Sequence, residues 1–406
     1  MADPATLTTP GRRTGGFGTI GVVGAGTMGA GIAQLALEHG HDVVLFDVEG
    51  AAVERARRRI ADGLARRVAR RGLRDEAAAE ATGQAMARLR EVAAVEEVAG
   101  SVDLVVEAAV ERLDLKRAVF ATLDAAAAPG TLLASNTSAL SIDAIAAATT
   151  RPERVLGLHF FNPAPVMPLV EVVAGAATTP GAATAAAGLV AGWGKRPVAV
   201  RDVPGFIVNR VNRPFTLEPL RLLESGAAGV TRIDRAVEAA GFPMGPFALM
   251  DFVGIDVNLA VAVTLFEGFH GAPRFRPSPI QRRLVDAGRL GRKSGRGFHV
   301  YGPDGAPLGP APEFAAGPDA GLPEAAIVER IVLAIVNEAF HALGQGVATR
   351  DDIDLALELG ARHPRGPFAW ADLLGLRHAT ALLEALAAAE GERFRPAPAL
   401  LGAAGG

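Results

Sequence analysis

The sequence predicts an α/β domain with a doubly wound, mostly parallel sheet, followed by two tandem all-α domains. Three observations support this fold class: apolar runs alternate with helical patterns at the start of the chain, strand signals stop near its middle, and the second helical pattern repeats the first. The expected division is a flexible tail (1–18), an α/β domain (19–201), a helical domain (202–301), a Pro/Gly-rich linker (302–322) and a second helical domain (323–406).

The α/β domain opens with a strand, a Gly-rich turn, a helix and a second strand. Residues 19–23 are an apolar run typical of a buried strand, residues 27–39 have helical spacing, and residues 41–47 are a second apolar run. A unit of this kind places the turn at the carboxyl edge of a parallel sheet, which is where such sheets bind ligands.

The Gly-rich turn has the spacing of a dinucleotide-binding fingerprint. Its first glycine permits a tight turn, its second lets a pyrophosphate approach the backbone, and its third lets the helix pack closely on the strand. The residues of this fingerprint are Gly24, Gly26, Thr27, Met28 and Gly29. The second strand ends in Asp47, where an acid binds a ribose hydroxyl, and no arginine follows that would hold a 2′-phosphate. We therefore expect a Rossmann-type domain that binds NAD rather than NADP; a Gly-rich turn without a ligand is the alternative.

Five further apolar runs predict the rest of the sheet, at residues 102–107, 131–134, 155–160, 169–173 and 197–200. Helical patterns between most of them imply a mostly parallel arrangement. Polar residues follow or end two of these runs: Ser135-Asn-Thr-Ser138 comes after one, and His159-Phe-Phe-Asn-Pro163 ends another. These segments are candidates for chemistry, because the ends of parallel strands line the ligand site of open α/β sheets.

The helical pattern beyond residue 205 occurs twice. At an offset of 120, Arg210 and Glu218 match Arg330 and Glu338, and after a one-residue insertion Gly245-Pro-Phe-Ala248 matches Gly366-Pro-Phe-Ala369. Matches in this order indicate a tandem duplication of the helical domain. We expect the second copy to pack on the first within the chain, and a homodimer is the alternative.

The composition is that of a globular protein and excludes several function classes. Hydrophobic residues make up 50% of the chain, charged residues make up 21%, and the net charge of −3 does not favour nucleic-acid binding. The absence of cysteine excludes disulfides, thiolate nucleophiles and cysteine-ligated metals. No apolar run approaches the roughly 18 residues of a membrane span, and the N-terminal segment lacks the apolar core of a secretory signal. We therefore expect a cytoplasmic protein with no metal site and no membrane partner.

Four separated motifs strongly resemble the 3-hydroxyacyl-CoA dehydrogenase family. They are Ser135–Ile142, His159–Pro163, Leu169-Val-Glu171-Val and Gly205-Phe-Ile-Val-Asn209-Arg. The resemblance covers residues 19–302 and extends to Glu107–Glu111, Lys116, Asp251–Gly254 and Gly291–Phe298. It implies reversible, NAD-dependent oxidation of an (S)-3-hydroxyacyl-CoA to a 3-oxoacyl-CoA, as in β-oxidation of fatty acids.

The resemblance also implies roles for individual residues. His159 would be the general base that takes the hydroxyl proton of the substrate, and Glu171 would orient its imidazole and stabilise the imidazolium. Ser138 and Asn209 would hydrogen-bond the reacting oxygens. Because Asn209 belongs to the second domain, the resemblance implies an active site at the domain cleft.

For the cofactor, the resemblance implies that Glu111 and Lys116 line the nicotinamide and ribose side, with Asn136 also at the cofactor site. The arginine-rich helix predicted over residues 53–74 either presents a solvated face or binds CoA phosphates. A short substrate such as 3-hydroxybutyryl-CoA is the default, and the tandem helical domains also resemble enzymes that act on 3-hydroxyadipyl-CoA.

Other interpretations stay open at the level of sequence. His159 alone is compatible with a buried core residue, Glu171 with an edge-strand acid, and Asn209 or Ser138 with a helix cap or turn. The 6-phosphogluconate and 3-hydroxyisobutyrate dehydrogenases have a similar fingerprint but resemble a lysine-centred mechanism, and no lysine occurs between Lys195 and Lys293. A non-catalytic NAD- or acyl-CoA-binding protein of the same fold is a further alternative.

Overall fold

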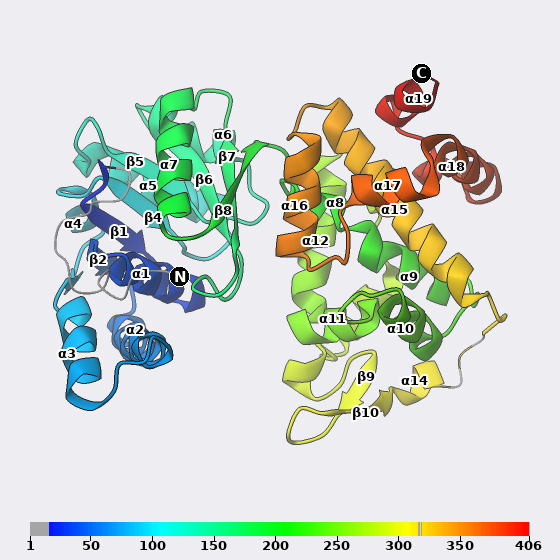
Figure 1. Ribbon diagram of the computed structural model, residues 1–406, viewed down its shortest axis with the longest axis horizontal. Coiled ribbons are helices and arrows are strands. Elements are labelled where there is room, and N and C mark those ends of the chain that lie inside the picture. The colour runs from blue at the N-terminus through cyan, green and yellow to red at the C-terminus, as the bar shows by residue number, and fades with distance from the viewer. Residues whose placement is uncertain (1–15, 316, 318, 406) are drawn as a thin grey trace. The chain divides into compact units, whose positions relative to one another are not determined.

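A computed structural model describes residues 16–315, 317 and 319–405, and the chain divides into two compact units between Asp202 and Val203. The first unit runs from blue to green in Figure 1, and the second runs from green to red. Residues 1–15 of the predicted tail lie outside the described residues. The predicted boundary after residue 201 is adjacent to the observed division.

The first unit is built on one eight-stranded sheet with the strand order β3-β2-β1-β4-β5-β6-β7-β8. Its strands are β1 (Thr19–Val23), β2 (Asp42–Phe46), β3 (Leu89–Glu91), β4 (Leu104–Glu107), β5 (Leu132–Ser135), β6 (Val155–Phe160), β7 (Leu169–Ala174) and β8 (Arg196–Arg201). All neighbouring pairs are parallel except β6 and β7, which are antiparallel. The order of the first six strands is that of a dinucleotide-binding doubly wound sheet, which confirms the predicted fold class.

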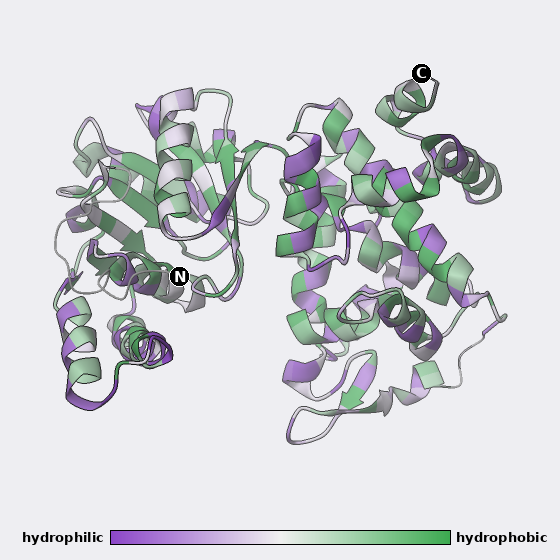
Figure 2. Cartoon of the chain, in the orientation of Figure 1, coloured by the Kyte–Doolittle hydropathy of each residue, from purple (hydrophilic) through white to green (hydrophobic). Residues whose placement is uncertain are grey.

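The helices of this unit connect the strands. They are α1 (Thr27–Glu38), α2 (Gly50–Arg70), α3 (Asp75–Met86), α4 (Glu96–Ala99), α5 (Leu113–Ala126), α6 (Ile142–Ala146) and α7 (Pro180–Gly192). The arginine-rich helix predicted over residues 53–74 is α2, which begins and ends earlier and is followed by α3. Apolar residues of α2 such as Ile60 and Leu64 are buried, whereas its hydrophilic residues gather along one side in Figure 2. Strand β3 was not predicted, because a three-residue strand with two exposed residues gives no apolar run.

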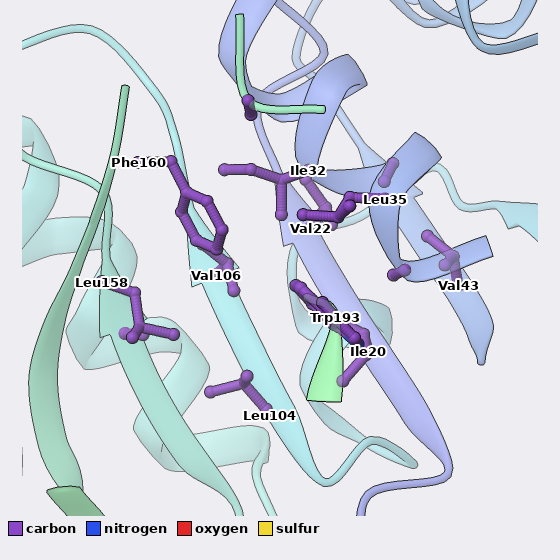
Figure 3. Packing of buried hydrophobic residues seen from close by; sticks show 14 of the residues in the cluster. Ile20, Val22, Ile32, Leu35, Val43, Leu104, Val106, Leu158, Phe160 and Trp193 are labelled. Carbon is purple, nitrogen blue, oxygen red and sulfur yellow. The ribbon is translucent and has the colours of Figure 1, made fainter. Parts of the chain in front are cut away.

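A hydrophobic core lies between the sheet and α1. Ile20 and Val22 of β1 meet Val106 of β4 and Ile32 and Leu35 of α1 in one buried cluster, as Figure 3 shows. Because α1 begins directly after the Gly-rich turn, this packing fixes the turn at the carboxyl end of β1.

Among its described residues, the second unit is helical apart from one short hairpin. Its helices are α8 (Val208–Val211), α9 (Pro214–Glu224), α10 (Val230–Ala239), α11 (Pro246–Val253), α12 (Ile255–Gly268), α13 (Pro279–Asp286), α14 (Pro312–Ala315), α15 (Glu324–Gly344), α16 (Arg350–Gly360), α17 (Pro367–Leu374), α18 (Leu376–Glu390) and α19 (Pro398–Gly405). Among the described residues no single helix is long and apolar enough to span a membrane, and only the sharply bent pair α11 and α12 reaches that length and composition when taken together.

The segment predicted as an extended linker is partly structured. Strand β9 (His299–Tyr301) pairs with β10 (Pro307–Pro310), and α14 follows. Glu313 of α14 forms an ion pair with Arg289, and Asp319 forms one with Arg232. Five Gly and Pro residues of this segment therefore serve the hairpin and its turn: Gly302, Gly305, Pro307, Gly309 and Pro310.

The structure contains the internal repeat. Helix α15 corresponds to α8 and α9 taken together, and α16, α17, α18 and α19 correspond to α10, α11, α12 and α13 at offsets of 119 to 121 residues. Asp234 and Asp354 occupy equivalent positions and accept the backbone N–H groups of Phe247 and Phe368 at the start of α11 and α17. The duplication therefore extends to individual side-chain contacts.

Buried ion pairs join the two helical copies reciprocally. The Nε atom of Arg210 in the first copy lies 2.7 Å from Oε1 of Glu338 in the second, and Nε of Arg330 in the second copy lies 3.2 Å from Oε2 of Glu218 in the first. Arg210 and Arg330 are equivalent in the repeat, as are Glu218 and Glu338. Reciprocal contacts of this kind characterise a two-fold interface. The two copies are thus joined within the chain by a reciprocal pair of contacts.

The buried His363 makes the stability of this packing pH-dependent. Burial lowers the pKa of His363 from 6.5 to about 3, so between these pH values the unfolded chain binds a proton that the folded protein excludes. The free energy of unfolding should therefore fall as the pH falls through this range, by up to about 1.4 kcal/mol per pH unit from this group alone. Replacing His363 by Phe, which the first copy carries at position 242, should flatten the pH dependence of urea unfolding. Identical pH slopes for both proteins would contradict this assignment.

Candidate active site

A buried histidine and a buried carboxylate face each other on neighbouring strands. Leu158 and Phe160 of β6 point into the core of Figure 3, so the alternation of the strand turns His159 to the opposite face. In the antiparallel pairing of β6 with β7, His159 lies directly across from Glu171. Their side chains share that face. The Nδ1 atom of His159 lies 2.5 Å from Oε2 of Glu171, and the residues are 4% and 0% exposed.

This pair has the chemistry of an oriented base. Since the carboxylate of Glu171 accepts a hydrogen bond from Nδ1–H of His159, the lone pair of the neutral imidazole is on Nε2. The carboxylate also stabilises the imidazolium that forms when Nε2 takes a proton, which is the role of the acid in a Ser-His-Asp triad. The arrangement can therefore take a proton from a substrate hydroxyl and return it.

The loop that carries Ser138 is held by Glu111. Oε1 of Glu111 accepts hydrogen bonds from the hydroxyl of Thr137 at 2.6 Å and from the backbone N–H of Ser138 at 2.8 Å. Just before this loop, Oδ1 of Asn136 accepts the backbone N–H of Phe160 at 2.9 Å. The structure thus ties the Ser138 loop, which follows β5, to the end of β6 that carries the histidine.

A buried ion pair that the sequence did not indicate lies beside this loop. Nζ of Lys116 donates to both carboxylate oxygens of Glu107, at 2.8 and 3.0 Å, and the hydroxyl of Ser135 donates to Oε2 at 2.7 Å. Glu107 and Ser135 end neighbouring strands in register, and that register carries no sequence signal. Lys116, predicted to line the nicotinamide side, also lies 3.5 Å from Oε2 of Glu111. It therefore connects the buried pair to the Ser138 loop.

Lys195 holds the loop between β6 and β7, another contact that the sequence did not indicate. Its Nζ donates to the backbone carbonyls of Ala164 at 2.7 Å and Met167 at 2.8 Å. Burial lowers the pKa of Lys195 to about 8. This lysine supports the segment that joins the strands of His159 and Glu171.

The Gly-rich turn fits a dinucleotide. Gly24 has φ +101°, and a Cβ there would lie 2.6 Å from the carbonyl oxygen of Ala108. A Cβ on Gly29 would lie 1.8 Å from the carbonyl oxygen of Gly24, whereas a Cβ on Gly26 would meet no atom within 4 Å. The first and third glycines are thus required by packing, and the second borders open space at the start of α1. A pyrophosphate is the group that such a helix N-terminus binds.

The acid predicted to bind the ribose lies at the same turn. Oδ2 of Asp47 accepts the backbone N–H of Ala25 at 2.7 Å, and Oδ1 accepts that of Glu49 at 3.0 Å. The carboxylate therefore lies directly beside the fingerprint, although Asp47 is distant from it in sequence. Thr27 and Met28 lie in the first turn of α1. Within the described ranges, no group of three or more His, Asp or Glu side chains is arranged to hold a metal ion.

A dinucleotide-binding sheet that presents an oriented histidine base at the ligand-binding edge defines the class of pyridine-nucleotide dehydrogenases. Within that class, the model of the 3-hydroxyacyl-CoA dehydrogenase NAD-binding domain matches residues 19–203. The model of the 3-hydroxyacyl-CoA dehydrogenase C-terminal domain matches twice, at residues 205–301 and 327–403. The chain belongs to the 3-hydroxyacyl-CoA dehydrogenase family and is an NAD-dependent oxidoreductase.

Individual relatives agree with this assignment. The chain is 39% identical to the 3-hydroxyadipyl-CoA dehydrogenase of Escherichia coli K12, over 93% of this chain and 95% of the relative. It is 42% identical to the human mitochondrial hydroxyacyl-coenzyme A dehydrogenase, over 69% of this chain and 90% of that protein. A solved structure of 3-hydroxybutyryl-CoA dehydrogenase from E. coli has a TM-score of 0.84 at 38% identity, covering 96% of this chain and 98% of that one.

These findings decide between the classes that the sequence left open. The predicted family, fold class and cofactor are confirmed, and neither the 6-phosphogluconate group nor a non-catalytic binding protein is favoured. Of the four predicted catalytic residues, His159 and Glu171 form a direct pair, and Ser138 lies on the loop after the neighbouring strand β5. Asn209 lies on α8 of the second unit.

Proposed function

We propose that this enzyme oxidises short-chain (S)-3-hydroxyacyl-CoA, such as 3-hydroxybutyryl-CoA, to the 3-oxoacyl-CoA and catalyses the reverse reduction. The observation that carries the proposal is the 2.5 Å contact between His159 and Glu171, in a chain of this family. A cytoplasmic location, expected from the sequence, stays a prediction.

In the proposed reaction, Nε2 of His159 takes the proton of the C3 hydroxyl. NAD, when bound, supplies the nicotinamide that accepts hydride from C3 of the substrate. Glu171 stabilises the positive charge that develops on the imidazole, because a buried carboxylate interacts with it more strongly than water does. Ser138 and Asn209 donate hydrogen bonds to the reacting oxygen as negative charge develops there.

The proposed cofactor residues are the fingerprint, Asp47, Glu111, Lys116 and Asn136. Asp47 is proposed to accept a ribose hydroxyl from its place beside the fingerprint turn. Glu111, Lys116 and Asn136 are proposed to shape the nicotinamide side of the cofactor site through the loop that carries Ser138. The contacts of Glu111 with Ser138 and Lys116 support this role.

The test of this function is the rate of NADH formation with 3-hydroxyacyl-CoA substrates of increasing chain length. We expect turnover with (S)-3-hydroxybutyryl-CoA, a decline of kcat/KM as the chain lengthens, and no turnover of the (R) enantiomer. Absence of turnover across the whole series would contradict the proposed function.

3-Hydroxyadipyl-CoA is a second candidate substrate. The observation that favours it is the tandem helical organisation, since the alignment with the E. coli 3-hydroxyadipyl-CoA dehydrogenase extends over 93% of this chain. Including it in the same assay beside 3-hydroxyhexanoyl-CoA, which has the same chain length and no terminal carboxylate, separates recognition of length from recognition of charge.

Asp47 should determine the choice of cofactor. A carboxylate accepts a hydrogen bond from the 2′-hydroxyl of NAD but repels the 2′-phosphate of NADP. Wild type should strongly prefer NAD in kcat/KM, and Asp47→Ala should lower this preference by about tenfold or more, for a loss of about 1.4 kcal/mol of discrimination. Steady-state kinetics with both cofactors measures the ratio. Equal use of NAD and NADP by the wild-type enzyme would contradict the assignment.

We also propose that the second helical copy acts as a built-in partner that leaves one active site per chain. At the position of Asn209 it carries Glu329, and the 21 residues that connect it to the first copy (302–322) are too few for a dinucleotide-binding domain. A chain ending after Ala315 would expose apolar residues of α9 that face the second copy, such as Phe215, which is buried and packs against His363. We expect it to dimerise or aggregate in light scattering. A soluble and fully active monomer of this length would refute the proposal.

A further inference from the structure

Helix α8, which carries Asn209, is not a self-supporting element. It has four residues, fewer than an isolated helix needs for stability. The chain enters it through Gly205 at φ +72° and Phe206 at φ +54°, both in the left-handed region. Such a conformation of a non-glycine residue persists only where the surrounding structure imposes it. The position of Asn209 therefore depends on what packs around α8.

The corresponding segment of the second copy is built differently. There the whole stretch from Glu324 to Gly344 is one continuous helix, α15, whereas the first copy is interrupted between α8 and α9. Pro214 lies at the interruption and Ala334 is its counterpart in α15. Proline lacks the backbone N–H and its ring clashes with the preceding turn, so it ends α8, while alanine lets α15 continue. The two copies thus differ at the segment that contains Asn209.

The continuous helix of the second copy holds α8 on one side. Helix α8 lies against α15 and α16 (Figure 1), and Oε1 of Glu338 on α15 lies 2.7 Å from Nε of Arg210, the residue after Asn209. The other oxygen of Glu338 lies 2.6 Å from Nε of Arg274. Arg210 is 0% exposed and Glu338 is 1% exposed. A charge pair buried to this degree fixes the geometry of both side chains, because each charged group has no water to bind in place of its partner.

His363, in the connection between α16 and α17, holds the other end of α8. Its Nε2 donates a hydrogen bond to Oδ1 of Asn212 at 2.7 Å, one turn beyond Asn209. The imidazole packs against the rings of Phe215 and Phe242. Phe242 is the residue of the first copy that corresponds to His363. The second copy thus has a hydrogen-bond donor, His363, where the first copy has the apolar ring of Phe242.

We propose that Glu338 and His363 are positioning residues of the second helical copy that fix α8 and thereby the side chain of Asn209. This inference rests on the proposed function of Asn209 at the reacting oxygen. The degenerate copy has lost the catalytic asparagine from its own helix, and it orients the asparagine of the other copy.

Replacing His363 in the full chain tests the inference. His363→Phe restores the residue of the first copy and removes the bond to Asn212. We expect kcat to fall about tenfold, within the roughly 100-fold that a 1 Å misplacement of a reacting group can cost. The KM for NAD should not change, because the dinucleotide-binding residues are untouched. His363→Gln should restore most of kcat, since its amide also donates a hydrogen bond to Asn212.

A second variant removes the same bond from the other side. Asn212→Val introduces the residue that the second copy has at the corresponding position, Val332. If the bond is the cause, the double variant His363→Phe/Asn212→Val should be no slower than either single variant. Losses of kcat that multiply in the double variant would overturn the proposal. If His363→Phe does not fold, Asn212→Val alone still tests the bond, and unchanged kcat in that variant would overturn the proposal.

The internal repeat provides a matched control. Glu218→Gln weakens the equivalent ion pair, which holds Arg330 on the continuous helix α15 and no proposed catalytic residue. It should lower the thermal midpoint and leave kcat unchanged. A loss of kcat in Glu218→Gln equal to that of His363→Phe at the same loss of stability would overturn the inference, as would unchanged kcat in His363→Phe.

Asn209→Ala separates failure of the inference from failure of the proposed function. Loss of kcat in Asn209→Ala together with normal kcat in His363→Phe would reject the positioning role alone. Full activity of Asn209→Ala would reject the proposed role of Asn209, and the positioning role with it.

Discussion

His159→Gln is expected to lower kcat by about 10²–10⁴-fold, the usual contribution of a general base. Glutamine has nearly the size of histidine, but its amide cannot take a proton at neutral pH. The hydroxyl proton of the substrate then has no acceptor at the place of the imidazole Nε2. Binding of NAD should be retained, because the fingerprint and Asp47 are untouched by the substitution. Stopped-flow measurement of hydride transfer and fluorescence titration with NADH give both quantities.

The matched control is His41→Gln. His41 is 2% exposed in the same unit, and its Nε2 accepts a hydrogen bond from the indole N–H of Trp193 at 2.9 Å. Its replacement should lower the thermal midpoint without changing kcat. A kcat of His159→Gln within a few-fold of wild type would show that another group takes the proton.

Glu171→Gln should have the second-largest effect, a loss of about 10²–10⁴-fold in kcat. In a Ser-His-Asp triad the corresponding carboxylate-to-amide change costs roughly 10⁴-fold, because the amide allows the wrong tautomer and no longer stabilises the imidazolium. Here Glu171 is fully buried and directly opposite His159, so no water substitutes for the lost charge. The KM for NAD should change little.

Glu171→Asp distinguishes a loss of charge from a loss of shape. The shorter carboxylate keeps the charge one methylene further from the ring and should recover part of the activity. If Glu171→Gln and Glu171→Asp were equally impaired while both remained folded by circular dichroism, packing rather than charge would explain the effect, and the triad-like role would be wrong.

Local patterns in the sequence predicted the framework of the site well. The strand–turn–helix at Gly24–Gly29 and the apolar run ending at His159 needed no knowledge of the rest of the chain, since glycine spacing and apolar periodicity act over a few residues. The internal repeat predicted the duplicated helices of the second unit. The short strands β3, β9 and β10 were missed because their sequences, LRE, HVY and PLGP, contain no apolar run, unlike the equally short β4 and β5.

Contacts that depend on register were not predictable in the same way. The sequence marked Lys116 and Glu111 only through their family resemblance, and the partner Glu107 was not assigned a role. The ion pair of Lys116 depends on how β4, β5 and α5 are placed in three dimensions. Strand register is set by packing of the whole sheet, so no short segment encodes it.

The sequence by itself determined the fold class, the NAD fingerprint, the candidate base with its carboxylate, and the duplication of the helical region. Only the tertiary structure decided that reciprocal ion pairs join the two copies, and that Glu338 and His363 contact Arg210 and Asn212 beside Asn209. The physical reason is how far apart along the chain the interacting residues lie. Helix and turn formation depend on residues within about four positions of each other. By contrast, the hydrogen bond between Arg210 and Glu338 joins residues 128 positions apart, and only the packed chain brings these side chains within 2.7 Å.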